Sequence, residues 1–97
     1  MFINVKKLNS KAKLPERATA TSAGADLCAC IDDDVVLMPG DRKLIPTGLA
    51  IAVPTGYGGF VFARSGLSSK FGVSLANCVG VIDSDYRGCL LYTSPSP

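Results

Sequence analysis

The sequence predicts an all-β domain assembled from short strands. Short runs of apolar, β-branched and aromatic residues recur along the chain, and glycines and prolines separate them. No repeat, low-complexity block or second domain interrupts this pattern. At 97 residues, the chain has the size of one domain. Its ten glycines and six prolines supply the turns between the strands. Short strands punctuated by such turns are typical of a sandwich or a barrel.

The turn residues set the order of the predicted strands. Strands are expected at residues 2–5, 27–31, 35–38, 60–63, 73–75 and 79–82, with a longer apolar segment at residues 43–53 that Pro46 and Gly48 interrupt. The connections are a loop at residues 11–22 and turns at residues 32–34, 39–41 and 54–59. We interpret the three aspartates at residues 32–34 as a solvated turn rather than a metal site.

A candidate anion site follows the strand at residues 60–63. The apolar run stops at Arg64, and Ser65 and Gly66 open a short helical turn before Gly72. A helix start presents unpaired N–H groups, an arginine adds forked donors, and a glycine allows close approach to the backbone. Phosphate is therefore the natural ligand. The alternative is an N-capped surface turn with a solvated arginine.

Residues 80–88 carry the most distinctive chemistry. A strand-like apolar run ends at Ile82 and is followed by a turn that contains Asp83 and Tyr86, with Gly88 available for a positive-φ conformation. A carboxylate that leaves a buried strand beside an aromatic ring suits a polar planar ligand and the activation of a water. On these residues alone, a solvated hairpin turn remains the alternative.

Asp26 stands alone among the small and apolar residues at positions 20–29. A carboxylate in such surroundings is usually hydrogen-bonded to backbone or placed near a cation. Asp26 therefore caps a turn, or it faces a metal ion held by phosphates. The residue types alone do not distinguish the turn cap from the metal site.

Taken together, these segments resemble the homotrimeric deoxyuridine triphosphatase (dUTPase) family. Residues 23–27 resemble its first motif, residues 64–67 its second, and residues 77–88 its third and most distinctive motif. Residues 39–41 and 45–50 match the framework of the family. Each motif alone is a weak signal, but the ordered set at these spacings is a strong one. The resemblance covers almost everything from Val5 to Gly88.

The resemblance implies a dUTPase-like β-clip fold, of β-barrel or jelly-roll type, that is incomplete at the C-terminus. It implies hydrolysis of dUTP to dUMP and pyrophosphate, so the complete protein is expected to be a dUTP diphosphatase of nucleotide metabolism and dUMP biosynthesis. Asp83 is then the catalytic general base, which orients and polarises the water that attacks the α-phosphorus. Asp26 acts through water on the Mg²⁺ that bridges the triphosphate.

The same resemblance implies the substrate-binding residues. Arg64, Ser65 and the backbone at Gly66 would hold phosphate oxygens. Tyr86 would pack on the deoxyribose and leave no room for a 2′-hydroxyl. The uracil edge would pair with Asn77 and with the backbone of Gly80, Val81 and Ile82, which excludes thymine and cytosine. Asp85 is given a structural role, or one in support of the residues that contact the substrate.

Assembly and truncation follow from the family pattern. Its active sites lie between subunits, so a homotrimer is expected, with the third motif from one subunit and the first and second from a neighbour. The fourth motif, an arginine and a glutamine on a later strand, and the fifth, a glycine-rich arm, have no counterpart in the chain. We therefore expect the chain as written to be an inactive or weakly active fragment.

Two domain segments are predicted. Residues 1–88 form the dUTPase-like domain, and residues 89–97 form a non-family tail. The tail resembles the translation of a transposon-type sequencing adapter, which makes it a candidate artefact to be excluded from fold reasoning. Its proline- and serine-rich part, from Thr93 onward, is expected not to propagate a strand ladder. The alternative is a genuine tail after a real truncation.

Composition excludes several other classes. A net charge of +2 is too slight for a nucleic-acid-binding face, and no apolar run is long enough to span a membrane. The four cysteines lack zinc-type spacing and no histidine is present, so reduced, structural thiols are expected. The N-terminus lacks a signal-peptide pattern, and a cytoplasmic location follows by default.

Rival functions remain. A dCTP deaminase relative would share the fold but needs a glutamate base, and Glu16 is the only glutamate in the chain. A second rival is a non-catalytic, nucleotide-binding or regulatory dUTPase-like module. Release of pyrophosphate, as opposed to nucleotide binding alone, separates catalysis from that module.

Overall fold

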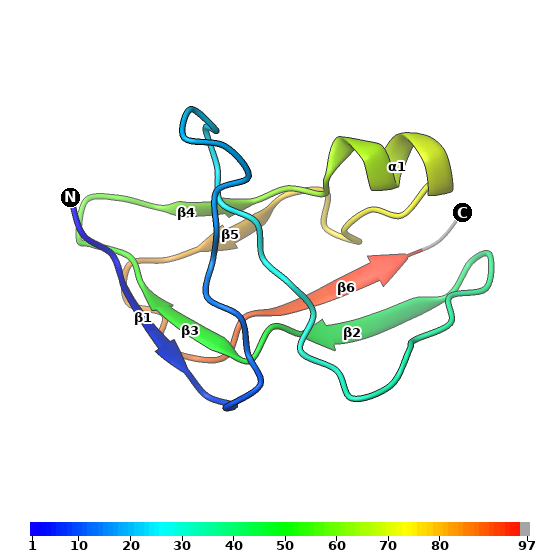
Figure 1. The fold of residues 1–97 in the computed structure, drawn as a ribbon, viewed down its shortest axis with the longest axis horizontal. Helices are drawn as coiled ribbons and strands as arrows, with labels where there is room; N and C mark the ends of the chain where they lie inside the picture. The colour runs from blue at the N-terminus through cyan, green and yellow to red at the C-terminus, as the bar shows by residue number, and fades with distance from the viewer. Residues whose placement is uncertain (96–97) are drawn as a thin grey trace.

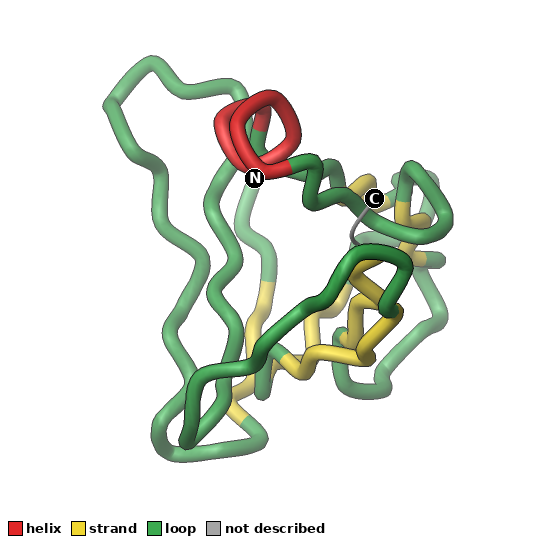
Figure 2. The backbone as a smooth tube through the Cα atoms, turned by 90° about the vertical axis from the view of Figure 1, so that its right-hand side faces the viewer, coloured by secondary structure: helices red, strands yellow, loops and turns green. Residues whose placement is uncertain are grey.

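The computed structural model describes residues 1–95, and these form an all-β fold with one short helix. The elements in chain order are β1 (Asn4–Lys7), β2 (Arg42–Pro46), β3 (Leu49–Ala52), β4 (Gly59–Val61), α1 (Ser65–Phe71), β5 (Gly80–Ile82) and β6 (Leu91–Pro95). The predicted all-β class is confirmed. Most of the backbone between these elements lies in loops and turns (Figure 2).

The strands pair in three two-stranded antiparallel sheets. These are β1 with β3, β2 with β6, and β4 with β5 (Figure 1). Of these pairs, β4 and β5 are consecutive strands in the sequence. The pairs β1–β3 and β2–β6 join strands that are separated along the chain, so these sheets tie distant parts of the chain together. The molecule measures 39 × 28 × 24 Å along its principal axes.

The turn between β2 and β3 is the most buried connection. Thr47 is buried, and its hydroxyl donates to the Leu90 carbonyl (2.9 Å) and accepts from the Leu49 N–H (3.2 Å). Gly48 has φ +69°, and a Cβ there would lie 2.9 Å from the Ala12 Cβ. Only glycine fits this position without displacement of its neighbours.

The hydrophobic core is small and includes Ile82 of the third motif. Val53, Ile82 and Leu90 are its buried members, and partly buried hydrophobic residues pack against them, namely Leu27, Ile51, Val61 and Tyr92. Strand β5 therefore ends in a core residue, Ile82, directly before Asp83. Burial of Ile82 fixes the point at which the chain returns to solvent.

Three predicted strands do not form. Residues 27–31, 35–38 and 73–75 have no strand assignment. In the second of these, Val36 is 65% exposed and Met38 is 61% exposed. Local β-propensity does not supply a partner strand, and none of these three segments forms a β-ladder with another segment among the described residues.

The helix and the turns agree better with the sequence. The predicted helical turn at residues 65–72 is the helix α1, which ends at Gly72 with φ +66°. The N–H groups of Gly72 and Val73 bond to carbonyls of the last turn, those of Ser68 (3.0 Å) and Leu67 (3.3 Å). A left-handed glycine is the usual way to end a helix.

The prediction for the tail was wrong in one respect. Residues 91–95 form β6, which pairs with β2 in a register that sets Leu91 opposite Pro46 and Pro95 opposite Arg42. Pro95 occupies the end of the ladder, where a missing N–H is tolerated. A strand therefore follows the third motif. The adapter origin of residues 89–97 is not tested by this geometry and stays a prediction.

In the part of the chain that the structure describes, no helix is long and apolar enough to cross a membrane.

Candidate active site

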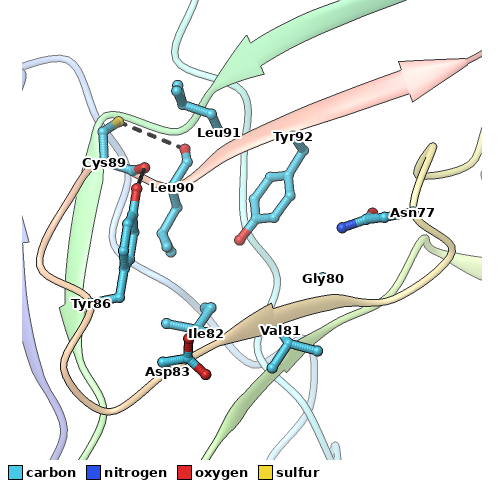
Figure 3. A pocket seen from close by; sticks show the side chains of 10 residues that line it. All are labelled: Asn77, Gly80, Val81, Ile82, Asp83, Tyr86, Cys89, Leu90, Leu91 and Tyr92. Carbon is cyan, nitrogen blue, oxygen red and sulfur yellow. Dashed lines mark hydrogen bonds between the residues drawn. The ribbon is translucent and has the colours of Figure 1, made fainter.

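The residues of the third motif converge on one cavity of about 230 Å³ (Figure 3). Six predicted residues line it, namely Asn77, Gly80, Val81, Ile82, Asp83 and Tyr86. The cavity is several times the roughly 30 Å³ share of one water molecule, so it has room for a small planar group.

Strand β5 places the carboxylate. One edge of β5 pairs with β4, with Val61 opposite Gly80 and Gly59 opposite Ile82. The cavity lies between β5 and the start of β6, because β6 pairs with β2 instead. Ile82 is buried and Asp83 is exposed, so the carboxylate stands where the buried strand meets solvent at the cavity. A turn follows, closed by the Tyr86 N–H on the Asp83 carbonyl (3.1 Å).

The turn after β5 holds Tyr86 against its own loop. The Tyr86 hydroxyl donates to the Cys89 carbonyl (2.8 Å), which orients the ring along one side of the cavity (Figure 3). Arg87 closes the other side of the turn through its Nη1, which donates to the Ser84 carbonyl (2.7 Å). Gly88 does not have the positive φ that we expected for it. The need for glycine there is one of space.

The approach to β5 contains a feature that the sequence did not reveal. Cys78 has φ +64°, and it is the one non-glycine residue with a positive φ in the described chain. It lies between Asn77 and Val79, whose N–H bonds to the Asn77 carbonyl (2.7 Å). This left-handed residue sets the turn that presents Asn77 to the cavity, at a cost in backbone strain.

Sequence reasoning also missed one wall of the cavity. Cys89, Leu90, Leu91 and Tyr92 complete the lining, although all four were assigned to the tail. The Tyr92 hydroxyl is buried and has no hydrogen-bond partner among residues 1–95. Burial, with smaller contributions from Tyr86 and Cys89, raises the pKa of Tyr92 from 10.0 to about 12. The apolar run at residues 90–92 was the available signal.

The first and second motifs meet in a separate cavity of about 570 Å³. Asp26, Arg64 and Ser65 line it, together with apolar residues of β4 and its surroundings. The Asp26 Oδ2 accepts a hydrogen bond from the Arg64 Nη1 at 2.6 Å. The charged partner of Asp26 in this chain is thus the Arg64 guanidinium, and a role of Asp26 toward a metal ion stays a prediction. Gly66 is exposed and lies outside this lining, with open space where a Cβ would stand.

The ion pair between Asp26 and Arg64 is weakly held. The two side chains are 41% and 63% exposed, respectively. Solvent screens such a pair, and its contribution to stability is below about 1 kcal/mol. Separation of this ion pair therefore costs little free energy.

Tyr92 lines both cavities, so they are neighbours. Asp83 lines the smaller one and Arg64 the larger. Within one chain, the expected general base and the expected phosphate ligand thus belong to different cavities.

Metal-binding capacity is limited. The described residues contain no group of three or more histidine, cysteine or acidic side chains able to hold a metal ion. Asp32 forms an exposed ion pair with Lys11 (3.0 Å), which fits the predicted solvated turn. A single carboxylate such as Asp26 nevertheless fits Mg²⁺, because this ion keeps several waters and uses one or two carboxylates beside substrate phosphates.

A small all-β domain with a carboxylate at a base-sized cavity, and with an arginine and a serine lining a second cavity, fits the class of nucleotide-binding domains. The dUTPase family profile matches residues 10–94. The chain belongs to the dUTPase family. The match extends past Gly88 through most of the segment that we had set apart as a tail.

Known relatives agree with this assignment. The deoxyuridine 5'-triphosphate nucleotidohydrolase of Syntrophotalea carbinolica is 54% identical over 86 residues, which are 89% of this chain. The chain spans 58% of the length of that relative.

Solved structures are similar as well. A mutant dUTPase from phage phi11 of S. aureus, described with a structural Mg(II) ion, superposes with a TM-score of 0.88 at 34% identity, covering 99% of this chain and 60% of that one. A mutant dUTPase of Staphylococcus bacteriophage 80alpha, solved with dUpNHpp, gives a TM-score of 0.85 at 36% identity, covering 96% and 53%.

Proposed function

We propose that the full-length protein hydrolyses dUTP to dUMP and pyrophosphate, and that this chain supplies its base- and phosphate-binding residues. The observation that carries the proposal is the convergence of the third-motif residues on one cavity, in a member of the dUTPase family. The chain as written, which spans little more than half of a curated relative, is proposed to be weakly active at most.

The smaller cavity is proposed to hold the nucleoside. The edge of β5 that does not pair with β4 faces this cavity, and its backbone N–H and C=O groups recognise the uracil edge together with the Asn77 amide. Tyr86 contacts the sugar from the side of the turn. Backbone recognition of this kind is rigid, so a base with the opposite order of donors and acceptors leaves buried groups unpaired.

Asp83 is proposed as the general base. Its carboxylate follows a core residue and is exposed at the cavity, so it is held by β5 yet accessible to water. There it accepts a proton from the water that attacks the α-phosphorus in line, and the bond from this phosphorus to the bridging oxygen breaks. Pyrophosphate leaves, and dUMP remains in the cavity.

The larger cavity is proposed to hold the phosphates. Arg64 and Ser65 donate to phosphate oxygens, with the exposed backbone at Gly66 as a further donor. Asp26 would hold Mg²⁺ through water, and this ion would neutralise part of the triphosphate charge. The exposed ion pair between Asp26 and Arg64 separates when phosphate and cation replace its two partners.

The separation of the two cavities supports a homotrimer with active sites between subunits. Asp83 of one subunit and the Arg64 cavity of a neighbour would then face one dUTP. Since dUTP is a soluble nucleotide, we also propose a cytoplasmic location, with neither nucleic acid nor membrane as partner.

The test measures pyrophosphate release from dUTP by the full-length protein and by its Asp83→Asn variant. We expect turnover to fall by about 10²- to 10⁴-fold, which is the usual contribution of general-base catalysis. Affinity for dUTP is expected to stay within a few-fold, because asparagine keeps the shape of aspartate. Equal turnover in the variant would reject the base assignment, and binding of dUTP without pyrophosphate release by the wild type would favour the non-catalytic module.

A further inference from the structure

Gly88 lies where a side chain would collide with Tyr86. A Cβ built on Gly88 would stand 2.5 Å from the Tyr86 hydroxyl oxygen, 2.7 Å from Cζ and 3.1 Å from Cε1. These distances are far inside van der Waals contact. The φ of Gly88 is not in the left-handed region, so the backbone conformation does not itself demand glycine. The space taken by the Tyr86 ring is what demands it.

The ring is also fixed from its far end. The Tyr86 hydroxyl donates to the Cys89 carbonyl at 2.8 Å (Figure 3). The acceptor is a backbone atom, so this bond does not depend on which side chain stands at position 89. Because 43% of Tyr86 is exposed, the position of its ring depends on the hydrogen bond to the Cys89 carbonyl and on the absence of a side chain at Gly88.

We propose that Gly88 is a positioning residue: its missing side chain lets the Tyr86 ring fold back onto the loop and stay against the nucleoside cavity, where the ring sets selectivity for a 2′-deoxyribose. This inference rests on the proposed function, since it assumes that the cavity holds the nucleoside. Gly88 itself touches no substrate and acts only through Tyr86.

A methyl group at position 88 displaces the ring rather than the fold. The atoms that it would strike are the far end of a flexible side chain, with solvent on one side. The ring swings outward and loses its bond to the Cys89 carbonyl. The side of the cavity that closes on the 2′ position then opens, so a ribonucleotide is no longer excluded by contact with the ring.

The test compares Gly88→Ala with Gly58→Ala in the full-length protein. Gly58 is a matched control, because a Cβ there meets only Phe60 at an ordinary 3.4 Å and lies outside both cavities. Two readouts are used. NMR of the free protein detects the nuclear Overhauser contact between the Tyr86 ring and the residue at position 88, and calorimetry compares the affinities for dUMP and UMP.

We expect Gly88→Ala to lose the ring contact pattern and to reduce the dUMP preference by about tenfold, while Gly58→Ala changes neither. In a Tyr86→Ala background the Gly88→Ala substitution should have no further effect on selectivity, because Gly88 acts through that ring. A purely structural role would instead lower the affinity for both nucleotides equally, in either background.

Two results would overturn the proposal. The first is an unmoved Tyr86 ring in Gly88→Ala with full selectivity. The second is a loss of selectivity that persists when Tyr86 is already alanine. If the wild type binds neither dUMP nor UMP, the proposed function and the sugar-selective role both fail, while the NMR contact still decides whether Gly88 positions the ring.

Discussion

The two cavities differ in how firmly their chemical groups are held. The smaller cavity, proposed to hold the nucleoside, is built on β5, whose last residue, Ile82, belongs to the core. The larger cavity, proposed to hold the phosphates, presents Asp26 and Arg64 in an exposed ion pair on loops beside β4 and α1. A site that must discriminate between bases needs fixed geometry, whereas one that receives a charged, mobile triphosphate benefits from groups that change partners at small cost.

The largest expected difference between the cavities comes from Arg64. In the full-length protein, Arg64→Ala should weaken dUTP binding by about 10- to 100-fold, since a charged hydrogen bond contributes about 1.5–3 kcal/mol. It should leave the selectivity between uracil and cytosine nucleotides unchanged. Asn77→Ala should instead reduce the selectivity between uracil and cytosine nucleotides, with a smaller effect on dUTP binding. Steady-state kinetics with dUTP and dCTP measures the affinity and the selectivity of each variant.

Loss of base selectivity in Arg64→Ala would show that the cavities do not divide the work in this way. The stability of Arg64→Ala provides a control. Because the ion pair with Asp26 is exposed, the free energy of unfolding should change by less than about 1 kcal/mol.

Asp26→Asn should act on the metal dependence. We expect the Mg²⁺ concentration for half-maximal activity to rise by about tenfold, the lower end of what removal of an outer-shell carboxylate costs. The maximal rate at saturating Mg²⁺ should be nearly restored. A variant with unaltered Mg²⁺ dependence would remove Asp26 from the metal site.

Tyr92 gives a test of the wall that the two cavities share. Its pKa is raised from 10.0 to about 12 in the folded chain, so the fold favours the neutral phenol. The stability that this provides is complete below pH 10 and is lost as the pH rises through about 12. Chemical denaturation across this window should show a smaller loss of stability for Tyr92→Phe than for the wild type. Equal slopes would contradict burial of the hydroxyl.

The smallest expected effect is on backbone strain. Cys78→Gly removes the side chain from a left-handed residue, which relieves about 1–2 kcal/mol of backbone strain in the folded state. Glycine also raises the conformational entropy of the unfolded chain, which lowers stability by about 0.4–1 kcal/mol. The net gain in stability should therefore lie between about 0 and 1.6 kcal/mol. Thermal unfolding measures it, with the same change at Ala76, which does not have a positive φ, as the destabilising control.

Sequence patterns predicted what local chemistry determines. The turns at residues 39–41 and 54–59 and the helix that ends at Gly72 follow from residue types and spacing, whereas the grouping of Asn77 with Asp83 followed from the resemblance to the dUTPase family. The strands at residues 35–38 and 73–75 were wrong, because pairing depends on a partner edge that propensity does not encode. The strand β6 was missed because the proline and serine residues from Ser94 onward argued against a ladder, although the register places Pro95 at the end of the strand.

Two features of the site lay beyond any pattern in the sequence. The left-handed conformation of Cys78 is imposed by the turn around it, since cysteine has no preference for positive φ. The reason for Gly88 lies in a contact with Tyr86, whereas a pattern-based reading attributes turn glycines to backbone freedom.

The central claim is that the third-motif cavity alone holds the nucleoside. Backbone amide NMR during a titration of this chain with dUMP tests it most directly. The account predicts that shifts concentrate at residues 77–92 and that Asp26 and the residues of α1 stay largely unmoved. Shifts centred on Asp26 and Arg64, with residues 80–86 unaffected, would contradict it.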